Sequence, residues 1–149
     1  MDAIEAIKSR RTIRRFKQTR IERTKLLELI DCARRAPAGG NFQAIEYVIV
    51  DEPQIRKQIF TCLAWAGHVR PKRNPAPHQE PTAYIVVLAD NEIKKYESAA
   101  VDAAAAIENM LIAAHAMGIG SCWISSVNRD DVRQILRAPD NFTIDSVIA

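Results

Sequence analysis

Six basic side chains gather within ten positions near the N-terminus: Lys8, Arg10, Arg11, Arg14, Arg15 and Lys17. The guanidinium fork of arginine matches the oxygens of a phosphate group, so this cluster can hold a phosphate. The same side chains could instead contact nucleic acid or form a solvated face. The chain of 149 residues has a formal net charge of only +3, which is too small to indicate a nucleic-acid protein. Aromatic residues are not interleaved with the arginines, and no known nucleic-acid motif surrounds them.

Side chains that perform nucleophilic or metal chemistry do not form a recognisable set. Cys32, Cys62 and Cys122 are widely spaced, with no C-x-x-C pair, so we interpret them as small core residues of a reduced protein. His115 lies in a long apolar segment, where we expect a hydrogen-bonded structural histidine. Asp102, earlier in that segment, is predicted to be a helix-dipole or interface partner. We therefore predict no catalytic side chain and no metal site.

Two short helices have recognisable N-terminal caps. Asp2 can cap a helix that leads into the basic cluster, and residues 12–16 are expected to follow as extended chain. Asn128, with Asp131 three residues later, can begin a helix near the C-terminus.

A further helix precedes a glycine-containing loop. Apolar residues at helical spacing from Leu26 onward predict the helix, with Arg34 and Arg35 in its last turn, where cations complement the dipole. This helix is expected to end near residue 36, because Pro37 disfavours helical geometry in the residue before it. Residues 38–41 then form a loop whose backbone can approach another molecule closely.

The rest of the chain alternates between strands and helices. Strands are predicted at residues 47–50, 84–88, 122–124 and 144–149, and helices from Pro53 and over residues 98–117. The continuous apolar run at 84–88 is typical of a strand covered on both faces. The helix over 98–117 is apolar on most sides and is predicted to be the central buried helix, closed by Gly118. Residues 67–81 form one long irregular segment, and the Rossmann dinucleotide fingerprint is absent.

Three segments together resemble the nitroreductase family of FMN-dependent enzymes. They are SRRTIRRF at 9–16, APAGGNFQ at 36–43, and AIENMLIAA at 106–114, which continues into GIGSCWI at 118–124. Their order and separations make the resemblance specific, and it covers nearly the whole chain. It implies an α+β fold with a mixed central sheet flanked by helices, built as an obligate homodimer with two FMN sites at the interface. Residues 1–149 are accordingly expected to form a single FMN-binding domain.

The basic cluster has a role in this resemblance. Arg10 and Arg11 are expected at the FMN phosphate, with a hydroxyl contribution from Thr12. Arg14 is expected at the N1/O2 edge of the flavin, where a cation favours the anionic reduced form. The alternative is that these arginines only solvate the end of a helix.

Two further segments are expected to contact the flavin. Pro37, Ala38, Gly39 and Asn41 would lie against the FMN that is bound mainly by the other subunit; family members commonly carry serines after the proline, so Ala38 and Gly39 leave only backbone donors. The alternative is a plain helix-ending loop.

The second of these segments follows the long helix. Trp123, Ile124, Ser125 and Ser126 match the stretch that packs along the flavin ring and presents a backbone N–H to flavin N5. Trp123 could equally be an ordinary core aromatic residue.

The resemblance implies an NAD(P)H-dependent flavin oxidoreductase. By a ping-pong mechanism, NAD(P)H would pass a hydride to flavin N5 and leave, and a small electrophile such as a nitroaromatic or a quinone would take its place. Residues 67–81 are expected to border the shared pocket. Two other classes stay open: the same fold with different flavin chemistry, such as dehalogenation, oxidation or flavin cleavage, and a non-enzymatic basic binding module.

Cellular location and the C-terminus complete the expectations. The sequence lacks both a signal-peptide pattern and a run of roughly 20 apolar residues, so we expect a cytoplasmic protein with no membrane partner. The chain stops at Ala149 within a predicted strand. The resemblance implies that a C-terminal extension, which embraces the partner subunit and brings basic residues to the phosphate, is absent, and hence that FMN is held loosely.

Overall fold

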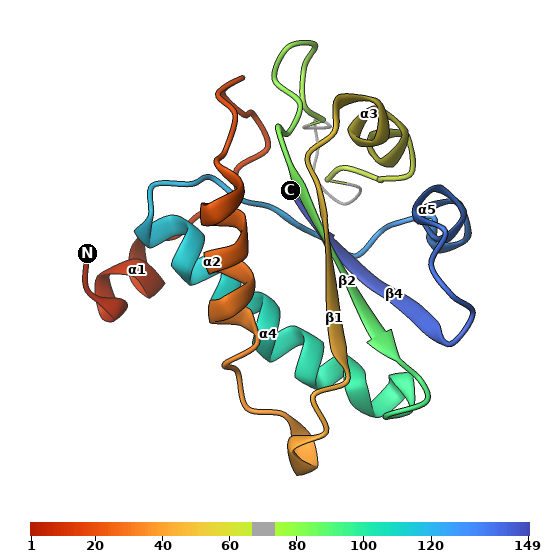
Figure 1. Ribbon diagram of the computed structural model, residues 1–149. Coiled ribbons are helices and arrows are strands. Elements are labelled where there is room, and N and C mark those ends of the chain that lie inside the picture. The colour runs from red at the N-terminus through yellow and green to blue at the C-terminus, as the bar shows by residue number, and fades with distance from the viewer. Residues whose placement is uncertain (67–73) are drawn as a thin grey trace.

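The structure is a computed structural model that describes residues 1–66 and 74–149. The helices are α1 (Ala3–Ser9), α2 (Arg23–Ala33), α3 (Pro53–Thr61), α4 (Tyr96–Ala116) and α5 (Arg129–Leu136), with a short 3-10 helix η1 (Gly39–Asn41). The strands are β1 (Ile45–Val50), β2 (Tyr84–Asp90), β3 (Trp123–Ile124) and β4 (Phe142–Ile148). Helices α1, α2 and α4 lie on one side of the sheet, and α3 and α5 lie on the other (Figure 1).

The four strands form one sheet in the order β1-β2-β4-β3, and every neighbouring pair is antiparallel. The expectation of a mixed sheet is therefore wrong for the described strands. Each of the two long connections returns the chain to the end of the sheet that it left: Val50 pairs with Tyr84, and Asp90 pairs with Phe142. Parallel pairing in the described part of the chain is limited to an isolated bridge between Thr12 and Ser121.

Strand β2 separates two hydrophobic cores. Ile85 and Val87 face the core that α2 and α4 complete, and Tyr84, Val86 and Leu88 face the core that α3 and α5 complete. Because successive side chains of a strand point to opposite faces, a strand with both faces covered must be apolar throughout. The prediction of a doubly covered strand at this position is confirmed.

Helix α4 buries one face against the sheet and α2, with Ile107 and Met110 fully buried. Its opposite face includes Val101, which is 72% exposed, so the central helix is not covered all round in one protomer. Gly118 follows the helix with a φ of +74°, a conformation that suits glycine. No helix of residues 1–66 and 74–149 is long and apolar enough to cross a membrane.

The predicted caps are confirmed, and one helix end differs. The Asp2 carboxylate accepts from the Glu5 N–H at 2.9 Å, and the Asn128 amide oxygen accepts from the Asp131 N–H at 3.3 Å. Helix α2 ends at Ala33 and not near residue 36 as expected. The N–H groups of Arg35 and Ala36 donate to carbonyls three residues earlier, which is a tighter turn than an α-helix has.

Candidate functional site

The basic segment is fixed against the chain that leads into β3. The Ile13 N–H donates to the Ser121 carbonyl at 2.9 Å, next to the bridge between Thr12 and Ser121. A Cβ at Gly120 would lie only 3.1 Å from the Ile13 side chain, so this close approach favours glycine. The contact brings two of the three predicted cofactor segments, residues 10–14 and 123–126, to the same edge of the sheet.

Arg14 is one of two half-buried arginines of the basic cluster, together with Arg10. Its side chain is half-buried beside Cys122, and its Nε atom is buried with no hydrogen-bond partner among the described residues. Burial raises the pKa of the Cys122 thiol, and the neighbouring Arg14 guanidinium partly offsets that increase. A cation with an unsatisfied donor in a partly desolvated position favours an anionic or hydrogen-bond-accepting group beside it.

Arg10 and Arg11 lie at the C-terminal end of α1, and their side chains make different interactions. Arg10 has a 25% exposed side chain whose Nε lies 3.9 Å from Oε1 of Glu108, a long ion pair. Arg11 donates through one guanidinium nitrogen to the carbonyls of Lys8, at 3.0 Å, and of Arg10, at 2.7 Å. Arg10 is thus the less constrained of the two, while Arg11 also stabilises the end of a helix.

The side chains of the 123–126 segment differ in exposure. Trp123 is 39% exposed, and its indole N–H donates to the Ser146 hydroxyl at 2.8 Å. Ile124 is 5% exposed and packs in the core beside α3 and α5, whereas Ser125 and Ser126 are exposed. Ile124 can therefore meet a cofactor only through its backbone. Trp123 is a surface aromatic with a satisfied N–H, so its interpretation as an ordinary core residue is wrong.

The third predicted segment lies elsewhere in the protomer. Pro37, Gly39 and Asn41 are exposed and Ala38 is half-buried, in the orange loop at the far end of α4 from α1 (Figure 1). The Gly39 N–H donates to Oδ1 of Asp102 at 3.0 Å, near the start of α4. Near the other end of α4, His115 hydrogen-bonds to the Ser9 hydroxyl at 2.8 Å, which confirms the predicted structural histidine.

Lys94 is a residue of this region that the sequence did not single out. Its ammonium donates to Oδ2 of Asp102 at 2.6 Å, and the two side chains are 15% and 8% exposed. Burial opposes the charge of Asp102, but Lys94 and the Gly39 N–H outweigh burial and hold the pKa of that carboxyl below its usual range. No local sequence pattern marks this pair, because the eight-residue separation spans a turn and the first helical residues.

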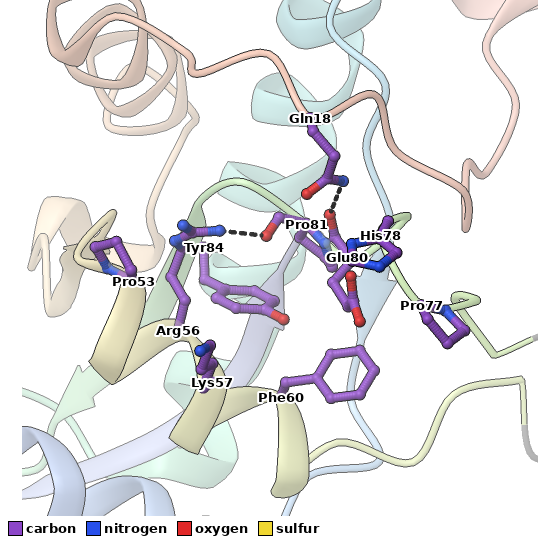
Figure 2. A pocket seen from close by; sticks show the side chains of 10 residues that line it. All are labelled: Gln18, Pro53, Arg56, Lys57, Phe60, Pro77, His78, Glu80, Pro81 and Tyr84. Atoms are coloured by element: carbon purple, nitrogen blue, oxygen red, sulfur yellow. Dashed lines mark hydrogen bonds between the residues drawn. The ribbon is translucent and has the colours of Figure 1, made fainter.

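A cavity of about 420 Å³ lies apart from the predicted cofactor residues, between α3 and the segment that precedes β2 (Figure 2). Arg56 on its rim donates to the Pro81 carbonyl at 2.9 Å, and the Gln18 amide donates to the Glu80 carbonyl at 3.0 Å. Pro77 and His78 also line it, and residues 67–73 lie outside the described part of the chain. The role expected of residues 67–81 beside a substrate stays a prediction.

Metal chemistry has no visible basis in the described residues. Within 1–66 and 74–149, no group of three or more His, Cys, Asp or Glu side chains is arranged to hold a metal ion. The chemistry that these residues favour is the binding of an anionic ligand at the β3 edge.

Solved structures define the class of fold. A nitroreductase family protein of Clostridium novyi NT superposes with a TM-score of 0.84 at 28% identity, over 99% of this chain and 83% of that chain. An FMN-dependent nitroreductase of Clostridium difficile R20291 superposes with a TM-score of 0.82 at 25% identity, over 98% of this chain and 84% of that chain. The α+β architecture is the nitroreductase fold.

Sequence comparisons define the family. A provisionally named NADH dehydrogenase/NAD(P)H nitroreductase of Archaeoglobus fulgidus is 29% identical over 99% of this chain and 83% of its own length. The model of the nitroreductase family matches residues 7–149. The chain belongs to the nitroreductase family.

Proposed function

We propose that this protein is a homodimeric, FMN-dependent oxidoreductase that uses NAD(P)H to reduce small electrophiles such as nitroaromatics or quinones. Family membership, the FMN-dependent relative in Clostridium difficile and the NAD(P)H nitroreductase name of the Archaeoglobus fulgidus relative support the activity. The observation that carries the proposal for this chain is the half-buried Arg14, whose Nε, beside the β3 edge, has no partner within residues 1–66 and 74–149.

The residues at this edge fit the charges of FMN. The cofactor has a phosphate dianion at one end and a ring edge that becomes negative on reduction at the other, so it needs cations at two places. Arg10, whose ion pair with Glu108 is long at 3.9 Å, is proposed to meet the phosphate together with Arg11 and Thr12. We assign Arg14 to the ring edge, because its buried Nε has no hydrogen-bond partner among the described residues.

The chemistry supplied by bound FMN is two-electron transfer, as a hydride from NAD(P)H to flavin N5 and then onward to the electrophile in a second half-reaction. The protein's share is to orient the ring and to stabilise charge. Trp123, whose indole is held by Ser146, offers an exposed aromatic surface for the ring. The backbone at Ser125 and Ser126 would offer an N–H to the flavin.

The site is proposed to be shared between two copies of the chain. The loop of Pro37, Ala38, Gly39 and Asn41 lies at the other end of α4 from the arginines of its own protomer, so we assign it to the flavin of the partner. The exposed apolar side chain of Val101 on α4 supports an interface along this helix.

Reconstitution tests the proposal directly. The purified protein should quench the fluorescence of added FMN with saturable stoichiometry, and NADH or NADPH should bleach the bound flavin under anaerobic conditions. Steady-state rates with a nitrobenzoate or a benzoquinone should give parallel double-reciprocal lines, as a ping-pong mechanism requires. A protein that binds no FMN, or whose bound FMN is not reduced by either nucleotide, would contradict the proposal.

A further inference from the structure

The loop between α2 and β1 has an unusual backbone. Gly40, Asn41 and Gln43 adopt φ values of +62°, +54° and +54°. Residues other than glycine seldom adopt this left-handed conformation, and it persists only where surrounding contacts hold it. The Phe42 ring packs back over Gly40, where a Cβ would lie 2.7 Å from it, yet 56% of Phe42 is exposed. The loop therefore needs support from outside its own residues.

That support comes from α4 and the turn before it. Asp102 uses both carboxylate oxygens: Oδ1 accepts from the Gly39 N–H at 3.0 Å, and Oδ2 accepts from Lys94 at 2.6 Å. A Cβ at Gly39 would lie 2.9 Å from the Lys94 ammonium, so the loop, the carboxylate and the ammonium are closely packed. Charge-assisted hydrogen bonds between poorly exposed groups are strong and directional, so the pair fixes the position of Gly39.

We propose that Asp102 and Lys94 are positioning residues for FMN: together they hold the loop of residues 38–42 in the shape in which it contacts the flavin bound by the partner's arginines. This inference rests on the proposed function, including the dimer. Neither side chain contacts the cofactor itself. Their effect passes through the Gly39 backbone to the exposed loop and from there to the other protomer.

The location of the pair makes the effect cross between subunits. Asp102 and His115, which contacts Ser9, are thirteen residues apart on α4, or about 20 Å along the helix. A change at Asp102 is thus far from the α1 end of its own protomer. It should act instead on the FMN that is bound by the arginines of the other chain.

Single substitutions give the first test. Asp102→Asn and Lys94→Met should each raise the FMN dissociation constant about tenfold, the size of effect typical of groups that orient ligand-contacting residues. Lys94→Arg, which keeps a cationic donor, should restore most of the affinity. Asp51→Asn is the control, because Asp51 also pairs with two cations, Arg20 at 3.7 Å and Arg23 at 3.6 Å, but follows the end of β1 that is opposite to the loop.

Mixed dimers give the decisive test. Arg10→Ala and Asp102→Asn chains carrying different tags are co-expressed and purified through both tags. If the loop serves the partner's flavin, one site of the mixed dimer combines both defects and the other has neither. The mixed dimer should then bind one FMN with wild-type affinity, although both parent homodimers bind weakly. A merely structural loss of stability in the Asp102→Asn chain would not produce a wild-type site.

The outcomes separate this inference from the function on which it rests. If the wild-type chain binds no FMN or is monomeric, the proposed function fails and the inference with it. If the wild-type dimer binds FMN but Asp102→Asn and Lys94→Met bind it equally well, the inference alone is wrong. A mixed dimer without a wild-type site would also overturn it, since the loop would then act within its own protomer. If Asp102→Asn does not fold, Lys94→Met takes its place in the mixed dimer.

Discussion

Arg10→Ala should weaken FMN binding strongly while leaving the folded protein almost as stable. The Arg10 Nε lies 3.9 Å from Glu108, and the two side chains are 25% and 49% exposed. Ion pairs of this kind contribute roughly 0.2 to 1 kcal/mol, so losing the pair changes the free energy of unfolding by at most about 1 kcal/mol. A charged contact to phosphate contributes roughly 1.5 to 3 kcal/mol, which corresponds to a rise in the FMN dissociation constant of about tenfold to hundredfold.

Glu108→Gln is the partner variant for this experiment. It removes the carboxylate that competes with phosphate for Arg10 but leaves Arg10 in place, so FMN should bind equally well or a few-fold more tightly. Fluorescence quenching titrations give the dissociation constants, and urea unfolding of the FMN-free proteins gives the stabilities. If the FMN dissociation constant of Arg10→Ala stays within about twofold of wild type, Arg10 does not contact the phosphate, because a contact of the usual strength would change the constant about tenfold or more.

Three further substitutions test other parts of the site. Arg14→Ala should lower the flavin reduction potential, because the cation stabilises the reduced ring edge. A contact of roughly 1.5 to 3 kcal/mol corresponds to a decrease of about 30 to 65 mV. An unchanged potential in a spectroelectrochemical titration would show that Arg14 does not lie at that edge. Val101→Lys changes a side chain that is 72% exposed in the protomer, so it should leave unfolding nearly unchanged but shift sedimentation toward monomer; a dimer as tight as wild type would place the interface elsewhere. The pKa of Asp102 is lowered in the folded state, so its stabilising contribution is present above the unfolded pKa of about 3.9 and is lost as pH falls through the lower folded value. In urea unfolding between neutral and acid pH, the free energy of unfolding of Asp102→Asn should therefore decrease less with falling pH than that of wild type. Identical pH dependences would contradict the assignment.

Local sequence signals determined most of the secondary structure. The caps at Asp2 and Asn128 work through side chains that reach backbone groups three residues away, so they are legible without any tertiary contact. The apolar run of β2 required cover on both faces, and the two cores supply it. The family motifs indicate the nitroreductase fold by themselves, because their order along the chain is specific.

Pairing between distant segments was decided only by the tertiary structure. The sheet is antiparallel, not mixed, because the connections before β2 and β4 return to the end of the sheet from which they started, and a helical pattern does not specify that direction. The inward direction of Ile124 likewise depends on packing against α3 and α5, which lie far from it or after it in the chain.

The candidate site shows the same division. Residue type marked a cluster of cations, and the family resemblance predicted that Arg14 is the one beside the flavin ring. Its partial burial beside Cys122 follows from the docking of residues 12–14 against residues 120–122, and its Nε has no partner in the part of the chain that the structure describes. The pairing of Lys94 and Asp102 with the Gly39 N–H joins segments that are 63 residues apart in the chain. Such a contact forms only when the α2–β1 loop folds onto the start of α4, and for that reason the sequence by itself did not reveal it.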